Sequence, residues 1–267
     1  MDMSHPERHP DESSTPSVED SLAAIDALCD LWDQQIPGTT RYRDGIDSPR
    51  AVGIMTHSHH AVRIARAIRR LATDFLGIEI VPLVRLLMEC AVTAAWLLLT
   101  PGSGDSMILD GARQRKKALS AIALHGGETE PAHSQAMSVL QKLEAASGPK
   151  NFAFEQRCLS LADGQRLYTT YRVLSLESHG GIGVSDFYIA TSKKSPIGFF
   201  YNPNAQSSRR EATLGLAACM LHLAMNADES ARSEPSMRSK LNEWASILGI
   251  DATIVGVAGR HTSERDC

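Results

Sequence analysis

Apolar residues recur three or four positions apart along most of this chain, which is the spacing of side chains on one face of an α-helix. In segment 17–36 they stand at Leu22, Ile25, Leu28 and Trp32. Ser17, which precedes this pattern, is a residue type that caps helix N-termini. We therefore predict an amphipathic helix over 17–36.

A longer helix is expected over 48–76, where Ser48-Pro49 marks the start and Gly77 the end. Its apolar stripe comprises Ile64, Ile68, Leu71 and Phe75. The most apolar segment of the chain follows, but its uncharged part runs only from Cys90 to Thr100. A helix that crosses a bilayer needs about 20 apolar residues. We predict a buried core helix here and no membrane span.

Further helical patterns cover 105–124, 131–146, 151–162, 165–178, 207–226 and 235–248. The exception is VSDFYIA and IGFFYNP, two aromatic, β-rich runs that are expected to form a hairpin or an ordered loop. The predicted fold is all-α: a single-domain bundle of eight or nine helices with a short β-like or loop insertion near 184–202. The domain is expected over 17–250, between a disordered N-terminal segment, 1–16, and a C-terminal tail, 251–267.

The net charge and the cysteines indicate which partners and which cellular compartment to expect. The formal net charge is −4, so no global positive field draws the protein to nucleic acid, and contact with RNA would need a local patch. The five cysteines are widely spaced without a C-x-x-C motif, which is typical of free thiols in a reducing compartment. The polar start MDMSHPERHPDESSTPSVED has no apolar core of a signal peptide. We expect a cytoplasmic protein.

Two charged residues, Arg85 and Glu89, stand one turn apart in the middle of the apolar core helix. A buried charge without a partner costs several kcal/mol, so these residues must be paired or face a polar cavity. They form either an intrahelical ion pair at a helix–helix seam or one wall of a polar binding pocket.

The stretch YRVLSLESHGG places Tyr171, Ser175 and His179 on one stripe of a helix. Arg172 and His179 are two turns apart and share a side. An Arg that stabilises phosphate charge and a His that transfers a proton could together cleave a phosphodiester. The alternative is a His that caps the helix C-terminus beside a surface Arg.

Histidines and arginines also gather on the helix over 48–76. His59, Arg63, Arg66 and Arg70 form a basic stripe, which is either a solvated face or a docking surface for phosphates or an acidic partner. No Glu-x-x-His motif lies inside a helix, so no metal site is predicted. The phosphate-binding and esterase glycine motifs do not occur, and no cofactor is predicted.

RLLMEC in an apolar helix, the charged DGARQRKK after it, and the later Y-x-x-x-S-x-x-x-H resemble a bacterial family of helical proteins of unknown function. That family is related in outline to the HEPN (higher eukaryotes and prokaryotes nucleotide-binding) superfamily, and the resemblance covers roughly 48–226. HEPN ribonucleases act as dimers on RNA with an Arg, four to six residues, and then a His near a helix end, which Arg172 and His179 match. Val173 departs from the motif, because the nuclease members usually have a polar residue there. The resemblance implies a defence or toxin-type role.

Three functions follow. The first is an HEPN-like, metal-independent ribonuclease with Arg172 and His179 as the catalytic pair. The second is a non-catalytic module that binds a protein partner or small molecule in a polar pocket. The third is a metal-dependent oxidase or hydrolase that uses the histidines.

We expect a homodimer, since the apolar helices and the aromatic segment near 184–202 leave much apolar surface. RNA is a candidate partner. The binding residues would be Arg85, Glu89, Tyr171, Ser175, His59, Arg63 and Arg66.

Overall fold

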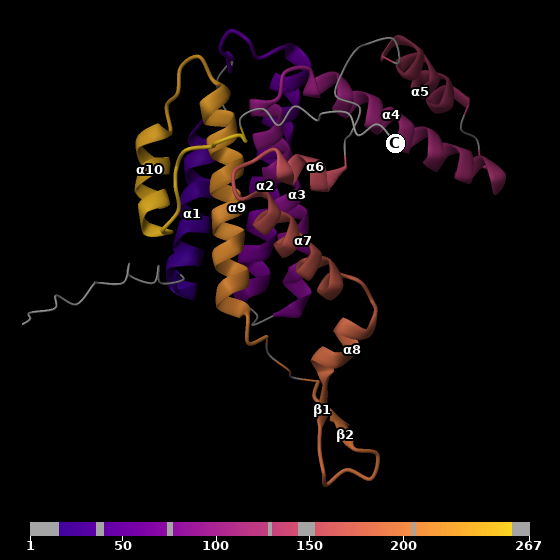
Figure 1. Ribbon diagram of the computed structural model, residues 1–267, viewed down its shortest axis with the longest axis vertical. Helices are drawn as coiled ribbons and strands as arrows, with labels where there is room; N and C mark the ends of the chain where they lie inside the picture. The colour runs from indigo at the N-terminus through magenta and orange to yellow at the C-terminus, as the bar shows by residue number, and fades with distance from the viewer. Residues whose placement is uncertain are drawn as a thin grey trace, which may run out of the picture.

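The computed structural model describes residues 16–35, 40–73, 77–127, 130–143, 153–203, 205 and 207–257. Ten α-helices and one two-stranded sheet lie within these residues. Four long helices run side by side as the core of the bundle: α1 (Val18–Gln35), α2 (Ser48–Thr73), α3 (Val81–Leu99) and α9 (Arg210–Ala231) (Figure 1). The predicted all-α, single-domain fold is confirmed.

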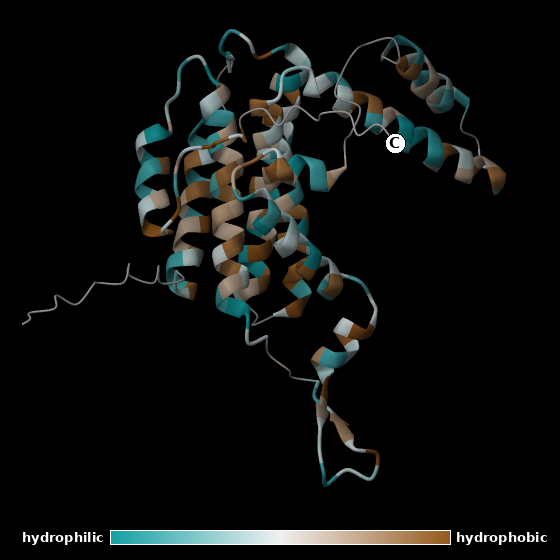
Figure 2. Cartoon of the chain, in the orientation of Figure 1, coloured by the Kyte–Doolittle hydropathy of each residue, from teal (hydrophilic) through white to brown (hydrophobic). Residues whose placement is uncertain are grey.

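The central helix, α3, follows a short 3₁₀ turn, η1 (Ile78–Ile80), and packs against α2, α7 and α9. Of the described residues, only segment Ile78–Leu99 is long and apolar enough to cross a bilayer, judged by length and composition. Most of its apolar side chains are buried inside the bundle. Figure 2 shows apolar residues, in brown, along the helices of the bundle. The prediction of a buried core helix is confirmed.

The predicted helical stripes face this core. Ile25, Leu28 and Trp32 of α1 are buried, as are Ile64 and Ile68 of α2. The backbone N–H of Asp20 donates to the Ser17 hydroxyl oxygen at 3.0 Å, so Ser17 caps α1 as predicted. Phe75, the last residue of the predicted stripe on α2, lies outside the described residues.

Helices α4 (Ser103–Leu124) and α5 (Glu130–Leu143) pack against each other and project from one end of the bundle (Figure 1). α4 approaches α2 closely at Gly104. A Cβ atom there would lie 2.7 Å from the backbone nitrogen of Arg50, so a larger residue would force the two helices apart. α10 (Arg238–Ile247) packs on the other side of the bundle against α9 and α1.

Helices α6 (Phe154–Leu159) and α7 (Gly164–Ser178) lie on α3. The chain then leaves the bundle as an arm made of α8 (Ile182–Tyr188), β1 (Ile189–Thr191) and β2 (Phe199–Tyr201) (Figure 1). The two strands are antiparallel, with Ile189 opposite Tyr201 and Thr191 opposite Phe199.

The hairpin was one of the two alternatives predicted for this insertion, but α8 was not predicted. β-Rich composition is only a weak preference, which tertiary contacts override. Here the Tyr188 hydroxyl donates to the Glu79 carboxylate at the start of the core helix, and this contact fixes the last turn of α8. The extra helix explains why the structure exceeds the expected eight or nine.

Residues 251–257, predicted as part of the tail, pair with the bundle. The backbone N–H of Ala162 donates to the Val255 carbonyl at 2.9 Å, and that of Val257 donates to the Ser160 carbonyl at 3.1 Å. These residues therefore belong structurally with the helical domain. The segments 1–15 and 258–267 lie outside the described residues.

Candidate functional site

A polar cluster joins α3 to α7. Arg85 and Glu89 lie one turn apart on α3, and Arg85 Nη2 is 3.2 Å from Glu89 Oε1. The same nitrogen donates to the Tyr171 hydroxyl on α7 at 2.7 Å, and the guanidinium carbon lies 4.9 Å from the centre of the Tyr171 ring. The side chains of Arg85 and Glu89 are 26% and 33% exposed. The predicted pair therefore forms, but it is half-buried and open to water.

A second arginine extends the cluster to α6. Arg157 donates from Nη1 to the Thr93 hydroxyl on α3, and its guanidinium carbon lies 5.6 Å from the Phe154 ring centre. Burial lowers the pKa of Arg157, while the carboxylates of Asp110 and Glu89 act in the opposite direction. The cluster thus collects charged and aromatic side chains from α3, α4, α6 and α7.

Sequence reasoning missed Arg157. Arg157 lies within a helical pattern, where it is indistinguishable from an ordinary surface arginine. Only the packing of α6 on α3 buries its side chain.

Ser175 and His179 do not join the cluster. The Ser175 hydroxyl donates to the Tyr171 carbonyl at 2.8 Å within its own helix. His179 follows Ser178, the last residue of α7, in extended backbone (φ −93°, ψ 142°), and its side chain is exposed. The sequence pattern led us to expect Arg85, Glu89, Tyr171, Ser175 and His179 in one polar pocket, and the structure brings together the first three.

The outer side of α7 is a mixed surface that we call the α7 face: Arg172, Val173, Leu176 and His179. All four residues are exposed, and Leu176, between Arg172 and His179 on the same side, is 70% exposed. Within the described residues, neither Arg172 nor His179 makes an ion pair or a side-chain hydrogen bond. The proposed catalytic pair is therefore accessible, but a large apolar side chain separates its members.

The arm beyond α7 is apolar on its surface. We define the apolar arm as residues 182–201. Its exposed apolar side chains are Ile182, Ile189, Ile197, Phe199, Phe200 and Tyr201. Leu176 on the α7 face is exposed as well, and on β2 the Phe200 side chain points to the opposite face of the hairpin from Phe199 and Tyr201.

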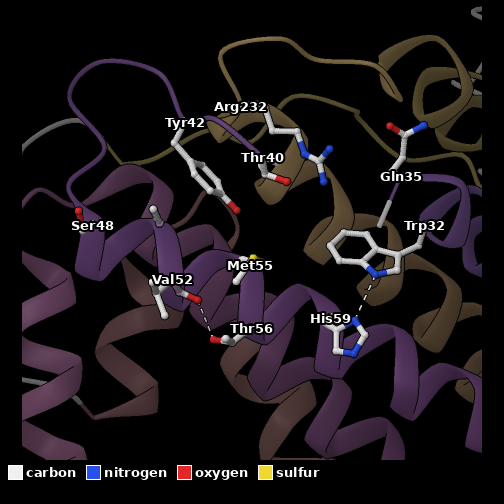
Figure 3. A pocket seen from close by; sticks show the side chains of 11 residues that line it. Trp32, Gln35, Thr40, Tyr42, Ser48, Val52, Met55, Thr56, His59 and Arg232 are labelled. Atoms are coloured by element: carbon white, nitrogen blue, oxygen red, sulfur yellow. Dashed lines mark hydrogen bonds between the residues drawn. The ribbon is translucent and has the colours of Figure 1, made fainter. Parts of the chain in front are cut away.

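Two of the four residues of the predicted basic stripe on α2, Arg66 and His59, bind other residues of the bundle. Arg66 forms an ion pair with Asp33 on α1 and donates to the Cys29 carbonyl at 3.2 Å. Arg63 is exposed. His59 accepts a hydrogen bond from the Trp32 indole at 3.3 Å and lines a pocket between α1 and α2 (Figure 3). Only part of the stripe is thus available for phosphates, because Arg66 instead ties α2 to α1.

The cysteine thiols and the possible metal ligands do not form a further site among the described residues. Cys29, Cys90 and Cys158 are buried free thiols, and burial raises their pKa values to about 11, about 12 and about 12. No three His, Cys, Asp or Glu side chains lie close enough to hold a metal ion in the part of the chain that the structure describes.

The model of a protein family of unknown function, DUF5677, matches residues 52–196, more than half of the chain. The chain belongs to this family. The part shared with DUF5677 runs from near the start of α2 into the turn between β1 and β2, and it contains Arg85, Arg157, Tyr171 and the α7 face. Helices α1, α9 and α10 lie outside it. No curated protein and no solved structure matches the chain.

Proposed function

We propose that this DUF5677 protein is a binding module that assembles as a homodimer through the α7 face and the apolar arm. The observation that carries the proposal is the set of exposed apolar side chains on the α7 face and on the arm, and the arm projects from the bundle (Figure 1). Monomeric soluble proteins rarely expose a contiguous apolar patch of more than a few hundred Å² unless another molecule covers it. Exposed aromatic side chains, as on β2, are typical of interface cores.

The shape of the arm supports the same proposal. β1 and β2 have three residues each, and an isolated two-stranded hairpin is at best marginally stable in water. The side chains of β2 are exposed along its whole length, so the hairpin gains little from packing on its own bundle. A partner that covers the hairpin would supply the missing burial.

Charge favours a second copy as that partner. Lys193 and Lys194 are exposed at the tip of the hairpin, and Asp186 is exposed on α8 at its base. In a two-fold arrangement of antiparallel arms, the basic tip of one arm lies over the acidic base of the other. Such complementarity fixes the orientation of the two copies.

Light scattering coupled to gel filtration tests the dimer. Phe200 on the arm and Ile122 on α4 are both 50% exposed, so Phe200→Ser and Ile122→Ser form a matched pair. Full burial of such a side chain contributes about 1.5–3 kcal/mol; because half of Phe200 is already buried and the contact counts twice in a two-fold dimer, Phe200→Ser should weaken dimerisation about ten- to a hundredfold. Ile122→Ser should leave it unchanged. A wild-type protein that remains monomeric at high micromolar concentration would contradict the proposal.

A second candidate function, metal-independent cleavage of RNA, is supported by the exposure of Arg172 and His179 without partners in the described residues. A two-fold dimer through the α7 face would bring two such pairs to the same interface. The ribose 2′-oxygen would attack the phosphorus and displace the 5′-oxygen of the next nucleotide. One His would accept the 2′-hydroxyl proton, the other would donate a proton to the leaving 5′-oxygen, and the Arg side chains would stabilise charge on the phosphate. The defence or toxin-type role implied by the HEPN resemblance belongs to this candidate.

This candidate predicts that the purified protein cleaves RNA in the presence of a chelator and leaves DNA of the same sequence intact, because DNA lacks the 2′-hydroxyl. His179→Ala should reduce the rate by at least about a hundredfold, the usual contribution of general acid–base catalysis. His60→Ala, which removes an exposed histidine from α2, is the control and should have no effect. RNA that stays intact at high protein concentration would leave the non-catalytic module as the function.

A further inference from the structure

A pocket of about 650 Å³ opens between α1, α2, residues 40–42 and the end of α9, on parts of the bundle that neither the arm nor the α7 face includes. The volume falls in the range of small-molecule sites, about 300–1,000 Å³. α2 forms one wall with Val52, Met55, Thr56 and His59 (Figure 3).

The body of the pocket is apolar and aromatic. Val52 and Met55 are exposed on α2, although helix surfaces are normally polar. Trp32 and Tyr42 stand on opposite sides of the opening in Figure 3. Tyr42 is half-buried, so its ring can contact a flat aromatic ligand in an offset-stacked or edge-to-face arrangement, whereas Trp32 is only 4% exposed and closes the far wall.

One end of the pocket holds an arginine in a fixed position. Arg232 follows the last residue of α9, and its Nε and Nη2 atoms are both 2.7 Å from Asp228 Oδ2. Asp228 is fully buried and also accepts a hydrogen bond from the Tyr42 hydroxyl at 2.9 Å. Burial and this carboxylate raise the pKa of Tyr42, so its hydroxyl stays a donor. Arg232 Nη1 makes no hydrogen bond within the described residues.

The other polar groups of the pocket also present donors. The Trp32 indole N–H can only donate, so His59 Nδ1 accepts from it and the neutral imidazole carries its proton on Nε2. The Gln35 side-chain oxygen accepts from the Ser236 hydroxyl at 2.6 Å, which leaves the amide nitrogen as a donor. Arg232, Gln35 and His59 therefore present donors to a ligand, while the Thr56 hydroxyl, which donates to the Val52 carbonyl, can accept.

We propose that this pocket binds a small aromatic acid, with the rings on Val52, Met55 and Tyr42 and the anionic group on Arg232. A second recess of about 490 Å³ shares Gln35, Thr40 and Arg232 with the first, and its lining is polar. It gives the acidic end room for a hydrated or polar substituent. The inference does not depend on the proposed dimer.

Two fluorescent probes with the same ring system test the proposal on the full-length protein. 1-Anilinonaphthalene-8-sulfonate carries an acid, and N-phenyl-1-naphthylamine does not. We expect saturable binding of one sulfonate per chain, about tenfold tighter than the amine, which corresponds to one charge-assisted hydrogen bond. Equal affinities for the two probes in the wild-type protein would overturn the proposal.

Substitutions inside and outside the pocket show where the two probes bind. Val52→Trp fills the pocket and should weaken both probes at least about tenfold, since the indole occupies the space of the ligand rings. Ile122→Trp, the same kind of change on α4, should have no effect. Phe200→Ser should also leave binding unchanged. Sulfonate binding that survives Val52→Trp but is lost in Phe200→Ser would place the probe on the apolar arm and overturn the proposal.

Substitution of Arg232 tests whether this residue binds the anionic group. Arg232→Gln should reduce sulfonate affinity to that of the amine, and the amine affinity should not change. Because the single variant leaves Asp228 buried without its cation, the double variant Arg232→Gln/Asp228→Asn keeps the pair neutral and the fold intact. If this folded double variant still prefers the sulfonate about tenfold, the assignment of Arg232 is wrong.

Discussion

The arginine at the start of α2 holds the end of α3. Arg50 is 3% exposed, and its three guanidinium nitrogens donate to backbone carbonyls: Nε to Leu97 at 2.7 Å, Nη2 to Leu98 at 2.6 Å and Nη1 to Gly45 at 2.7 Å. The carbonyls in the last turn of a helix have no intrahelical partners, and a cation there also interacts favourably with the helix dipole. Burial lowers the pKa of Arg50, opposed by the carboxylate of Asp47.

Replacement of Arg50 by Met should therefore be costly. The change removes three hydrogen bonds with a charged donor, each of which contributes about 1.5 kcal/mol or more, and leaves buried carbonyls without donors. With partial relaxation of the helix end, we expect a loss of about 3–5 kcal/mol in the free energy of unfolding. Met has a similar length, so a cavity contributes little to this loss.

Arg69→Met is the matched control, since it makes the same change on the same helix. Arg69 is 34% exposed and pairs with Asp26 on α1 at 2.9 Å. An exposed ion pair contributes at most about 1 kcal/mol.

Urea unfolding followed by circular dichroism gives the loss in the free energy of unfolding for each variant. The comparison requires that the free energy has the same slope against urea concentration in both variants. If Arg50→Met loses no more stability than Arg69→Met, the carbonyl contacts of Arg50 do not stabilise the end of α3 and the reasoning fails.

Three further predictions concern stability and reactivity. Burial lowers the pKa of His222, whose Nε2 donates to the Leu241 carbonyl at 2.9 Å, from the ordinary 6.5. The unfolded chain binds this proton first as pH falls, so stability is complete above pH 6.5 and decreases below it by up to about 1.4 kcal/mol per pH unit. Chemical unfolding at a series of pH values should show a shallower decrease in His222→Gln; an unchanged slope would contradict this. Tyr171→Phe removes one hydrogen bond from Arg85, which keeps its other contacts, and should cost about 1 kcal/mol in urea unfolding; a loss as large as that of Tyr171→Ala would mean that the hydroxyl alone anchors α7. Burial raises the pKa of Cys158 to about 12, so this thiol should react with iodoacetamide at pH 8 only after denaturation, as peptide mass spectrometry can establish.

The positions of the long helices could be predicted from the sequence because their signal is local. An apolar residue every third or fourth position, a capping residue such as Ser17 and a stop such as Gly77 each act within a few residues. The predicted helices near 17–36, 48–76 and 105–124 accordingly match α1, α2 and α4 to within a few residues over the described part of the chain. The ion pair of Arg85 and Glu89 was predictable for the same reason, because one helical turn separates them.

Contacts between distant segments were decided by the tertiary structure. Ser175 and His179 share a stripe with Tyr171 in the sequence, but only Tyr171 reaches Arg85, since α7 meets α3 at that turn and then leaves the bundle. The β-rich start of the insertion forms α8, whose last residue, Tyr188, bonds to Glu79, a contact that no local preference encodes.

The aromatic pocket is the clearest case of a site without a sequence signal. Trp32, Tyr42, Val52 and Arg232 come from four separate segments, and each looks ordinary in its own. The periodicity of a sequence specifies which side of a helix is buried, but not which other helix covers it. That choice depends on how the side chains of all helices fill the interior together, so Arg232 and Trp32 share a pocket only once α9 has packed against α1 and α2.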